Sequence, residues 1–168
     1  MAGNKYIANN AGVLTEVAAS QASTGAPDAG KIVALDGNGL LDNSVMPSGI
    51  GADTAAIATS ESLAAGDLVN IWNSTGAKVR KADATVAGKE AMGFVLSGFT
   101  HPATAVIYFE GNNNQVTGLT PGKQFLSITA GLATATAPSG SGNAVQNIGF
   151  ATSATNLNFQ ANPPIVLA

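Results

Sequence analysis

Apolar and polar positions alternate over short stretches throughout residues 51–168. In the segment 103–110, for example, Ala105, Ile107 and Phe109 fall on one face, as in a strand with one buried side. By the same pattern we expect strands over residues 54–59, 67–73, 77–82, 91–97, 103–110, 124–129, 132–136, 144–150 and 155–160. Turn-forming Gly, Pro, Asn and Ser residues separate nearly every pair. Short strands at this spacing predict an all-β fold, a small sandwich or barrel.

Helix is the alternative in two segments. Residues 52–66 are rich in Ala, the best helix former, but their apolar positions form no clean stripe with a helical period. We therefore expect at most a helical turn near residues 61–65. Residues 13–23 could form two helical turns.

The first fifty residues have a different pattern of apolar and polar positions. Short apolar pieces alternate here with small and turn-forming residues. The pieces are KYIA (5–8), VLTEV (13–17) and KIVAL (31–35). We expect KIVAL to form a strand, because a linker (19–30) precedes it and a DGNG turn (36–39) follows it. Such a segment cannot build a core of its own. We therefore divide the chain into an extended N-terminal arm, residues 1–50, and a β-barrel or sandwich domain, residues 51–168; the alternative for the arm is a disordered tail.

Composition indicates that other subunits cover much of the surface. Only 10% of the residues are charged, against roughly a quarter in an ordinary soluble domain. Much of the 45% apolar fraction is Ala, and the chain has only six Phe, two Tyr and one Trp. Burying a large aliphatic or aromatic side chain is worth roughly 1.5–3 kcal/mol, so a chain with few of them gains little on folding alone. Contacts between subunits are the expected supplement.

Several partner classes are disfavoured. The seven Lys and Arg residues are scattered without a patch, so no nucleic-acid partner is expected. No stretch reaches the roughly 18 apolar residues of a membrane span. The first residues lack the basic start and apolar run of a signal peptide, which favours synthesis in a cytoplasm. Without cysteine, neither a disulfide nor a thiolate metal site is possible.

Catalytic chemistry has few candidates, and we expect no enzyme. His101 is the only histidine and stands beside Pro102 in an apparent loop. A lone histidine without cysteine excludes the common zinc sites, and no GxSxG motif presents a serine nucleophile. The carboxylates that remain for a glycosidase are Asp67, Asp83, Glu90 and Glu110. All four fall at strand ends or turns, and their spacing singles out no pair.

Two motifs imitate ligand sites. Residues 25–31 match the phosphate loop GxxxxGK, but Ile32 replaces the Ser or Thr that would hold magnesium, and Asp28 inside the loop would repel phosphate. The segment from Asp36 lacks the glutamate of an EF-hand, although a looser calcium site made by Asp36, Asn38 and Asp42 stays open. We expect no cofactor and no metal.

Three stretches resemble structural proteins of tailed-phage particles. They are AGKIVALDGNGLLDNSVMP (29–47), LAAGDLVNIWNSTG with KVRKADAT and AMGFVLSG (63–98), and the C-terminal stretch from LTPGKQFLS to the end (119–168). The order of these turn and strand motifs is similar to that of the small head decoration proteins, or capsid cement proteins, of tailed bacteriophages. Together they cover roughly two thirds of the chain.

The resemblance implies a virion structural protein on the capsid exterior. Such proteins have a compact, β-tulip-like barrel and bind as homotrimers at three-fold and quasi-three-fold positions of the major capsid protein. The resemblance brings no catalytic residues. Because the C-terminal pattern also occurs in tail proteins, a phage tail or fibre protein that binds a receptor or glycan is the alternative, and a glycan hydrolase is a third.

The arm is the expected attachment to the capsid, and residues 52–168 the expected trimer body. An extended arm can add a strand to an exposed sheet edge on its neighbour. The expected capsid contacts are the large apolar side chains of the arm: Tyr6, Ile7, Val13, Leu14, Ile32, Val33 and Leu35.

Overall fold

The computed structural model describes residues 4–46 and 51–168, and within these ranges the chain is built almost entirely from β-strands. Only two single-turn 3-10 helices interrupt them, so the predicted all-β class is confirmed. The chain divides into two compact units, Met1–Gly51 and Ala52–Ala168, which we call the N-terminal unit and the body.

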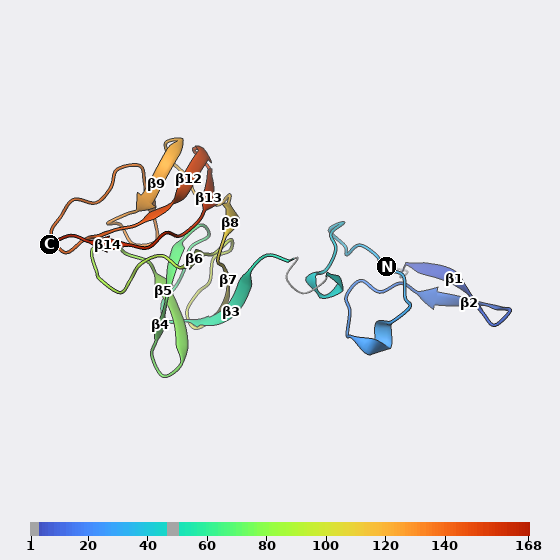
Figure 1. The fold of residues 1–168 in the computed structure, drawn as a ribbon. Coiled ribbons are helices and arrows are strands. Elements are labelled where there is room, and N and C mark those ends of the chain that lie inside the picture. The colour runs from blue at the N-terminus through green and yellow to red at the C-terminus, as the bar shows by residue number, and fades with distance from the viewer. Residues whose placement is uncertain (1–3, 47–50) are drawn as a thin grey trace. The chain divides into compact units, whose positions relative to one another are not determined.

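The N-terminal unit begins with an isolated hairpin. Strand β1 (Lys5–Asn10) pairs antiparallel with β2 (Val13–Ala18), and no other strand among the described residues joins them (Figure 1). The loop between them has two residues, Ala11 and Gly12, both with positive φ, as a type I′ hairpin turn requires. The helical alternative for residues 13–23 is therefore wrong: pairing with β1 makes VLTEVA a strand.

The rest of the N-terminal unit consists of loops that are joined by hydrogen bonds. The 3-10 helices η1 (Ala26–Asp28) and η2 (Asn43–Val45) are its only helical turns in residues 4–46. Ser20 forms a parallel bridge with Val33, donating its N–H to the Ile32 carbonyl at 2.9 Å and accepting from the Ala34 N–H at 2.9 Å. The strand expected over residues 31–35 is reduced to this bridge, because no strand in the described part of the chain pairs with it.

The body contains a closed five-stranded barrel. Its strands are β3 (Thr54–Thr59), β4 (Leu68–Asn73), β5 (Ala77–Lys81), β6 (Gly93–Phe94) and β7 (Thr104–Tyr108), in the order β3-β5-β4-β6-β7. The expected shared face of residues 103–110 is confirmed, since Ala105 and Ile107 are fully buried in the barrel core and Phe109 packs against it. Residues 52–66 form β3 and a loop rather than a helix.

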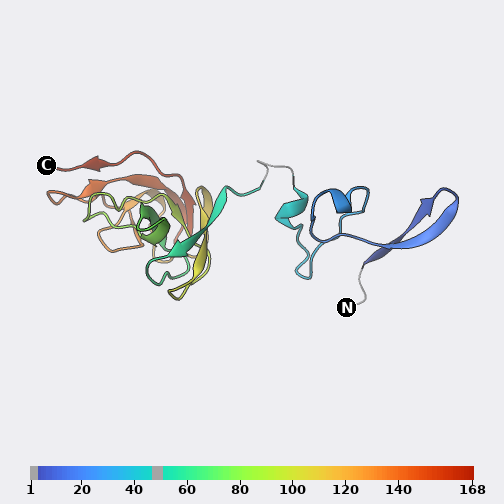
Figure 2. The same ribbon diagram turned by 90° about the horizontal axis from the view of Figure 1, so that it is seen from below.

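A second sheet packs beside the barrel. It has the order β10-β9-β12-β13-β8, and Figures 1 and 2 show β9, β12 and β13 alongside one another. Its strands are β8 (Gly111–Asn113), β9 (Gly122–Leu126), β10 (Ala133–Thr134), β12 (Asn147–Ser153) and β13 (Asn156–Phe159), and a separate pair joins β11 (Ala144–Val145) to β14 (Ile165–Val166). Strands β8 and β14 lie in segments that the alternation did not mark as strands.

Strands β4 and β6 hold the barrel and the second sheet together. Leu68 of β4 and Phe94 of β6 lie in the core that the second sheet covers. Their neighbours Val69 and Val95 lie in the barrel core. Each chain segment therefore buries one side chain in each of two cores, which explains why the body is one unit.

Candidate functional site

The residues with possible catalytic chemistry do not converge. Among residues 4–46 and 51–168, no three His, Asp or Glu side chains come together as a metal-ligand set. His101 lies with Nδ1 3.1 Å from the carbonyl oxygen of Thr59, and its backbone N–H donates to Ser62 Oγ at 3.0 Å. A carbonyl only accepts, so Nδ1 donates in this contact and the ring ties a loop to β3.

The four carboxylates named for a glycosidase have local partners or face solvent. Asp67 lies 3.1 Å from Lys81 Nζ and accepts the N–H of Ala64 at 2.7 Å. Asp83 accepts hydrogen bonds from the N–H and the hydroxyl of Thr85. Glu90 accepts the N–H of Gly88 at 3.0 Å, and Glu110 is exposed. Three of these carboxylates are therefore held by groups close to them, and the fourth is open to solvent.

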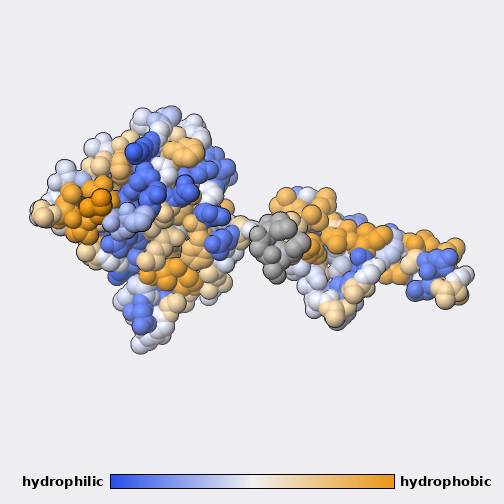
Figure 3. Space-filling view, in the orientation of Figure 1, coloured by the Kyte–Doolittle hydropathy of each residue, from blue (hydrophilic) through white to orange (hydrophobic). Residues whose placement is uncertain are grey.

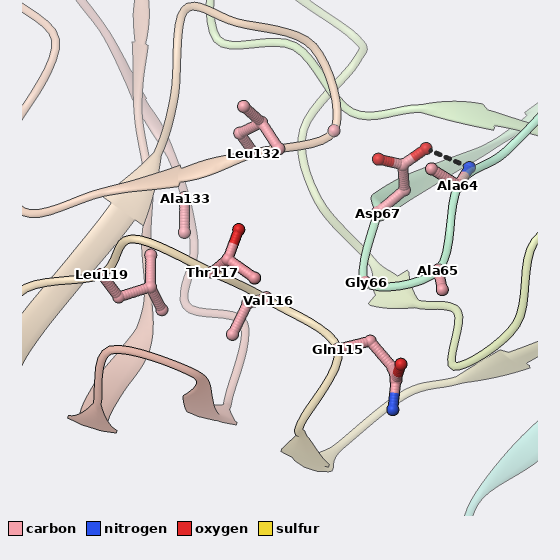
Figure 4. A pocket seen from close by; sticks show the side chains of 11 residues that line it. Ala64, Ala65, Gly66, Asp67, Gln115, Val116, Thr117, Leu119, Leu132 and Ala133 are labelled. Carbon is pink, nitrogen blue, oxygen red and sulfur yellow. Dashed lines mark hydrogen bonds between the residues drawn. The ribbon is translucent and has the colours of Figure 1, made fainter.

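One pocket of the body contains a buried carboxylate. Figure 4 shows it between the turn Ala64–Asp67, the segment 115–119 and the segment 131–133. Asp67 is its only charged lining residue, and Lys81 balances the charge. The other lining side chains are small or apolar, apart from the Gln115 amide and the Thr117 hydroxyl, so the one charged group of the pocket is already paired.

In the segment that resembles a phosphate loop, residues 25–31, the charged side chains bind groups of the same loop. Asp28 Oδ2 accepts the Thr24 N–H at 2.6 Å and the Thr24 hydroxyl at 2.7 Å, and Lys31 Nζ lies 2.8 Å from Asp28 Oδ1. The bond from Lys31, followed by those from Thr24, holds the pKa of Asp28 well below its ordinary value. The one lysine of the motif is therefore paired with the carboxylate inside it, and the loop offers no cradle for phosphate.

The possible calcium ligands are likewise bound to their own turns. Asp36 Oδ1 accepts the N–H of Asn38 at 2.8 Å and of Leu40 at 2.9 Å, and the bond from Leu40, then that from Asn38, lowers the pKa of Asp36. Asp42 caps η2 by accepting the hydroxyl and the N–H of Ser44, which lowers its pKa. These carboxylates each use one oxygen to organise a backbone turn, which accounts for their positions without a metal.

Acid should loosen the N-terminal unit. Because the folded pKa of Asp28, Asp36 and Asp42 lies below the ordinary value, their stabilisation is complete above about pH 4 and is lost as the pH falls through the lowered values. Hydrogen exchange should show the Leu40 amide losing protection in that range. In Asp36→Asn the amide oxygen still accepts but does not titrate, so protection should respond less to acid. Equal loss of protection in both proteins would contradict the assignment.

The N-terminal unit has no buried residue between positions 4 and 46. Eight of its large aliphatic side chains are exposed instead, with exposed fractions from 46% for Val33 to 72% for Leu14. We call these eight the aliphatic surface: Ile7, Val13, Leu14, Ile32, Val33, Leu35, Leu40 and Leu41. Figure 3 shows apolar residues over much of the visible face of this unit. Fully burying one such side chain is worth roughly 1.5–3 kcal/mol, so the surface favours a partner.

The expected capsid contacts and the aliphatic surface overlap. Six of the seven are exposed, and Tyr6 is half-buried in the hairpin. Leu40 and Leu41 were missed, although their place directly after the DGNG turn, in a unit without a core, was a signal that could have found them.

The charged groups of this unit are already bound within it. Lys5 pairs with Glu16, Lys31 pairs with Asp28, and the other two carboxylates accept from backbone N–H groups. What the unit offers to a partner is therefore mainly apolar area. No helix within the described residues has the length and apolar character to cross a bilayer.

Comparison with protein-family models, with curated proteins and with solved structures finds no match for this chain.

Proposed function

We propose that this chain is a non-enzymatic structural protein of a phage particle, a homotrimer that decorates and stabilises the outside of the capsid. The aliphatic surface is the observation that supports this proposal. With no residue of 4–46 buried, this unit gains little free energy from burying its own apolar side chains. A shell protein such as the major capsid protein would supply the missing apolar contacts. The sequence resemblance supports the same assignment.

Attachment through several copies explains how a small protein could stabilise a shell. A subunit that binds two neighbouring capsomers adds a binding free energy that must be lost before they separate. In a trimer, the second and third contacts become intramolecular once the first has formed. Avidity can then exceed single-site affinity by about 10²–10⁴ without any new contact.

Charged substitutions on the aliphatic surface should abolish attachment. In the double variant Ile32→Glu/Leu35→Glu we expect affinity for undecorated capsids to fall about 100-fold or more, because two apolar contacts are lost and two carboxylates must be desolvated. The measurement is co-sedimentation of purified protein with capsids. The control is Val106→Glu, an exposed aliphatic position on β7 of the body, which should bind normally. Unchanged capsid binding by the double variant would refute the proposal.

A tail or fibre protein with a receptor- or glycan-binding role is the alternative. The observation that favours it is a pocket in the body lined by Ser127, Thr134, Thr136, Ser139 and Asn143, whose hydroxyl and amide groups suit a sugar. That lining has no aromatic ring to stack on a sugar face, which is why we place it second. Quantitative mass spectrometry of particles separates the two: hundreds of copies indicate the shell, a handful the tail.

A further inference from the structure

The outer face of the pair β4–β5 carries the only tryptophan of the chain beside two cations. In the register of this pair, Trp72 lies directly opposite Lys78, and Asn70 lies directly opposite Arg80. Val79, which stands between the two cations, is fully buried in the barrel core, so Lys78 and Arg80 project from the other side of β5. The pairing therefore brings both cations and the indole together on one outward face.

The guanidinium of Arg80 is held in place by neutral groups. Its Cζ atom lies 4.8 Å from the centroid of the Trp72 ring, which is a cation–π contact. Its Nε donates to Asn70 Oδ1 at 3.0 Å, and Nη2 donates to the carbonyl oxygen of Gly88 at 2.8 Å. Because a guanidinium has five N–H donors, these two bonds leave others available. The charged group is thus positioned before any ligand arrives.

Neither cation has a carboxylate partner within the described residues. The ion pairs found there involve other lysines. Two carboxylates of neighbouring segments are bound to backbone instead: Glu61 accepts the Lys81 N–H at 2.7 Å, and Glu90 accepts the Gly88 N–H at 3.0 Å. Charged groups that are withdrawn from water are normally paired. Two half-buried cations without a counter-charge therefore favour an anionic partner.

We propose that this face binds an extended acidic segment of a partner protein, with one carboxylate on Arg80 and a second on Lys78. Side chains on one face of a strand are two residues apart, which is about 6.4–6.8 Å. Carboxylates on alternate residues of an extended peptide have the same spacing, so each meets one cation. Hydrogen bonds between a guanidinium and a carboxylate are charge-assisted and therefore among the strong ones. This inference goes beyond the proposed function, which rests on the N-terminal unit.

A nucleic acid is the weaker candidate for this face. Single strands bind largely by stacking their bases on aromatic rings, and Arg80 already covers the Trp72 ring from one side. The chain also has a net charge of −3, which repels a long phosphate polymer that extends past the two cations. A short segment with few carboxylates meets mainly the local positive charge.

The test is a titration of the full-length protein with a short synthetic peptide of alternating Glu and Thr, followed by the fluorescence of Trp72. The unsubstituted chain should bind this peptide and should not bind the same peptide with Gln in place of Glu. Arg80→Gln and Lys78→Gln should each weaken binding about 10-fold or more, because a charge-assisted contact is lost. The matched control Lys123→Gln removes the same charge from an exposed position on β9 and should bind normally.

Each outcome of the titration decides for or against the acidic segment. Lys78→Gln keeps the test valid if Arg80→Gln is unstable, since the bonds to Asn70 and Gly88 belong to Arg80. Absence of binding by the unsubstituted chain, or equal weakening by Lys123→Gln, would overturn the inference. Tighter binding of oligothymidylate than of the peptide would also overturn it and would identify a nucleic acid as the occupant. The proposed function is judged separately, by the capsid binding of its own variants.

Discussion

Gly149→Ala should unfold the body or reduce its free energy of unfolding by more than about 4 kcal/mol. A Cβ atom at this position would lie 2.0 Å from the carbonyl oxygen of Asn158 and 3.1 Å from both the Asn158 carbonyl carbon and the Gln160 nitrogen. Gly149 also has a φ of +114°, in a region that side-chain-bearing residues rarely adopt.

The clash at Gly149 cannot be removed by a small shift of a side chain. All three atoms belong to backbone, and Gly149 pairs directly with Phe159 in the β12–β13 ladder. The same glycine follows a register shift between β12 and β9, so it also maintains the bulge there. Moving β13 away from β12 would break the sheet that covers the core around Phe94 and Phe159.

Gly122→Ala is the matched control. Gly122 has a nearly identical φ of +116°, but no atom lies within 4 Å of the added Cβ. This variant therefore measures the backbone conformation alone, at about 1–3 kcal/mol. Denaturant unfolding followed by the fluorescence of Trp72, the only tryptophan, gives both values. Equal losses in the two variants would contradict the clash.

Gln146→Leu should lower the free energy of unfolding by about 3–5 kcal/mol, since each buried polar group left unpaired costs about 1–3 kcal/mol. The Gln146 side chain is 3% exposed, accepts the Ala91 N–H at 2.7 Å, and donates to the Ala91 carbonyl at 2.9 Å and the Asn162 carbonyl at 3.1 Å. Its amide thus pairs with Ala91 as a strand backbone would. Leucine has a similar volume but offers neither a donor nor an acceptor.

The control for Gln146 is Gln160→Leu, at the exposed position that directly follows β13. The same chemical change there should alter the free energy of unfolding by less than about 0.5 kcal/mol. Both variants can be compared by urea denaturation of the full-length chain. A loss at Gln146 no greater than that at Gln160 would show that the amide bridge contributes nothing to stability.

Most of the body was predictable because its strands alternate strongly and are separated by turn residues. The strand expected over residues 54–59 matches β3, and those around residues 67–73 and 77–82 match β4 and β5 within one residue at their ends. Strand β8 was not predictable, since its sequence GNN has low β-propensity and is a strand only because β13 pairs with it. Strand β14 depends in the same way on its pairing with β11.

In the N-terminal unit, local sequence was ambiguous and pairing decided the outcome. VLTEVA is compatible with a helix or a strand, and the two-residue turn at Ala11–Gly12 selects the strand by placing it against β1. KIVAL has a strong strand sequence, yet among the described residues its ladder pairing is limited to the bridge between Val33 and Ser20. Strand propensity without a partner is thus insufficient.

By itself, the sequence determined the all-β class, the strands of the body and the scarcity of reactive side chains, because alternation and residue type are local properties. It also identified most of the large apolar residues of the first fifty. Only the tertiary structure decided that these side chains stay exposed, since burial depends on whether a second layer covers them, and the N-terminal unit has none within residues 4–46. The same holds for Trp72, Lys78 and Arg80, which share one face only once the register between β4 and β5 is set.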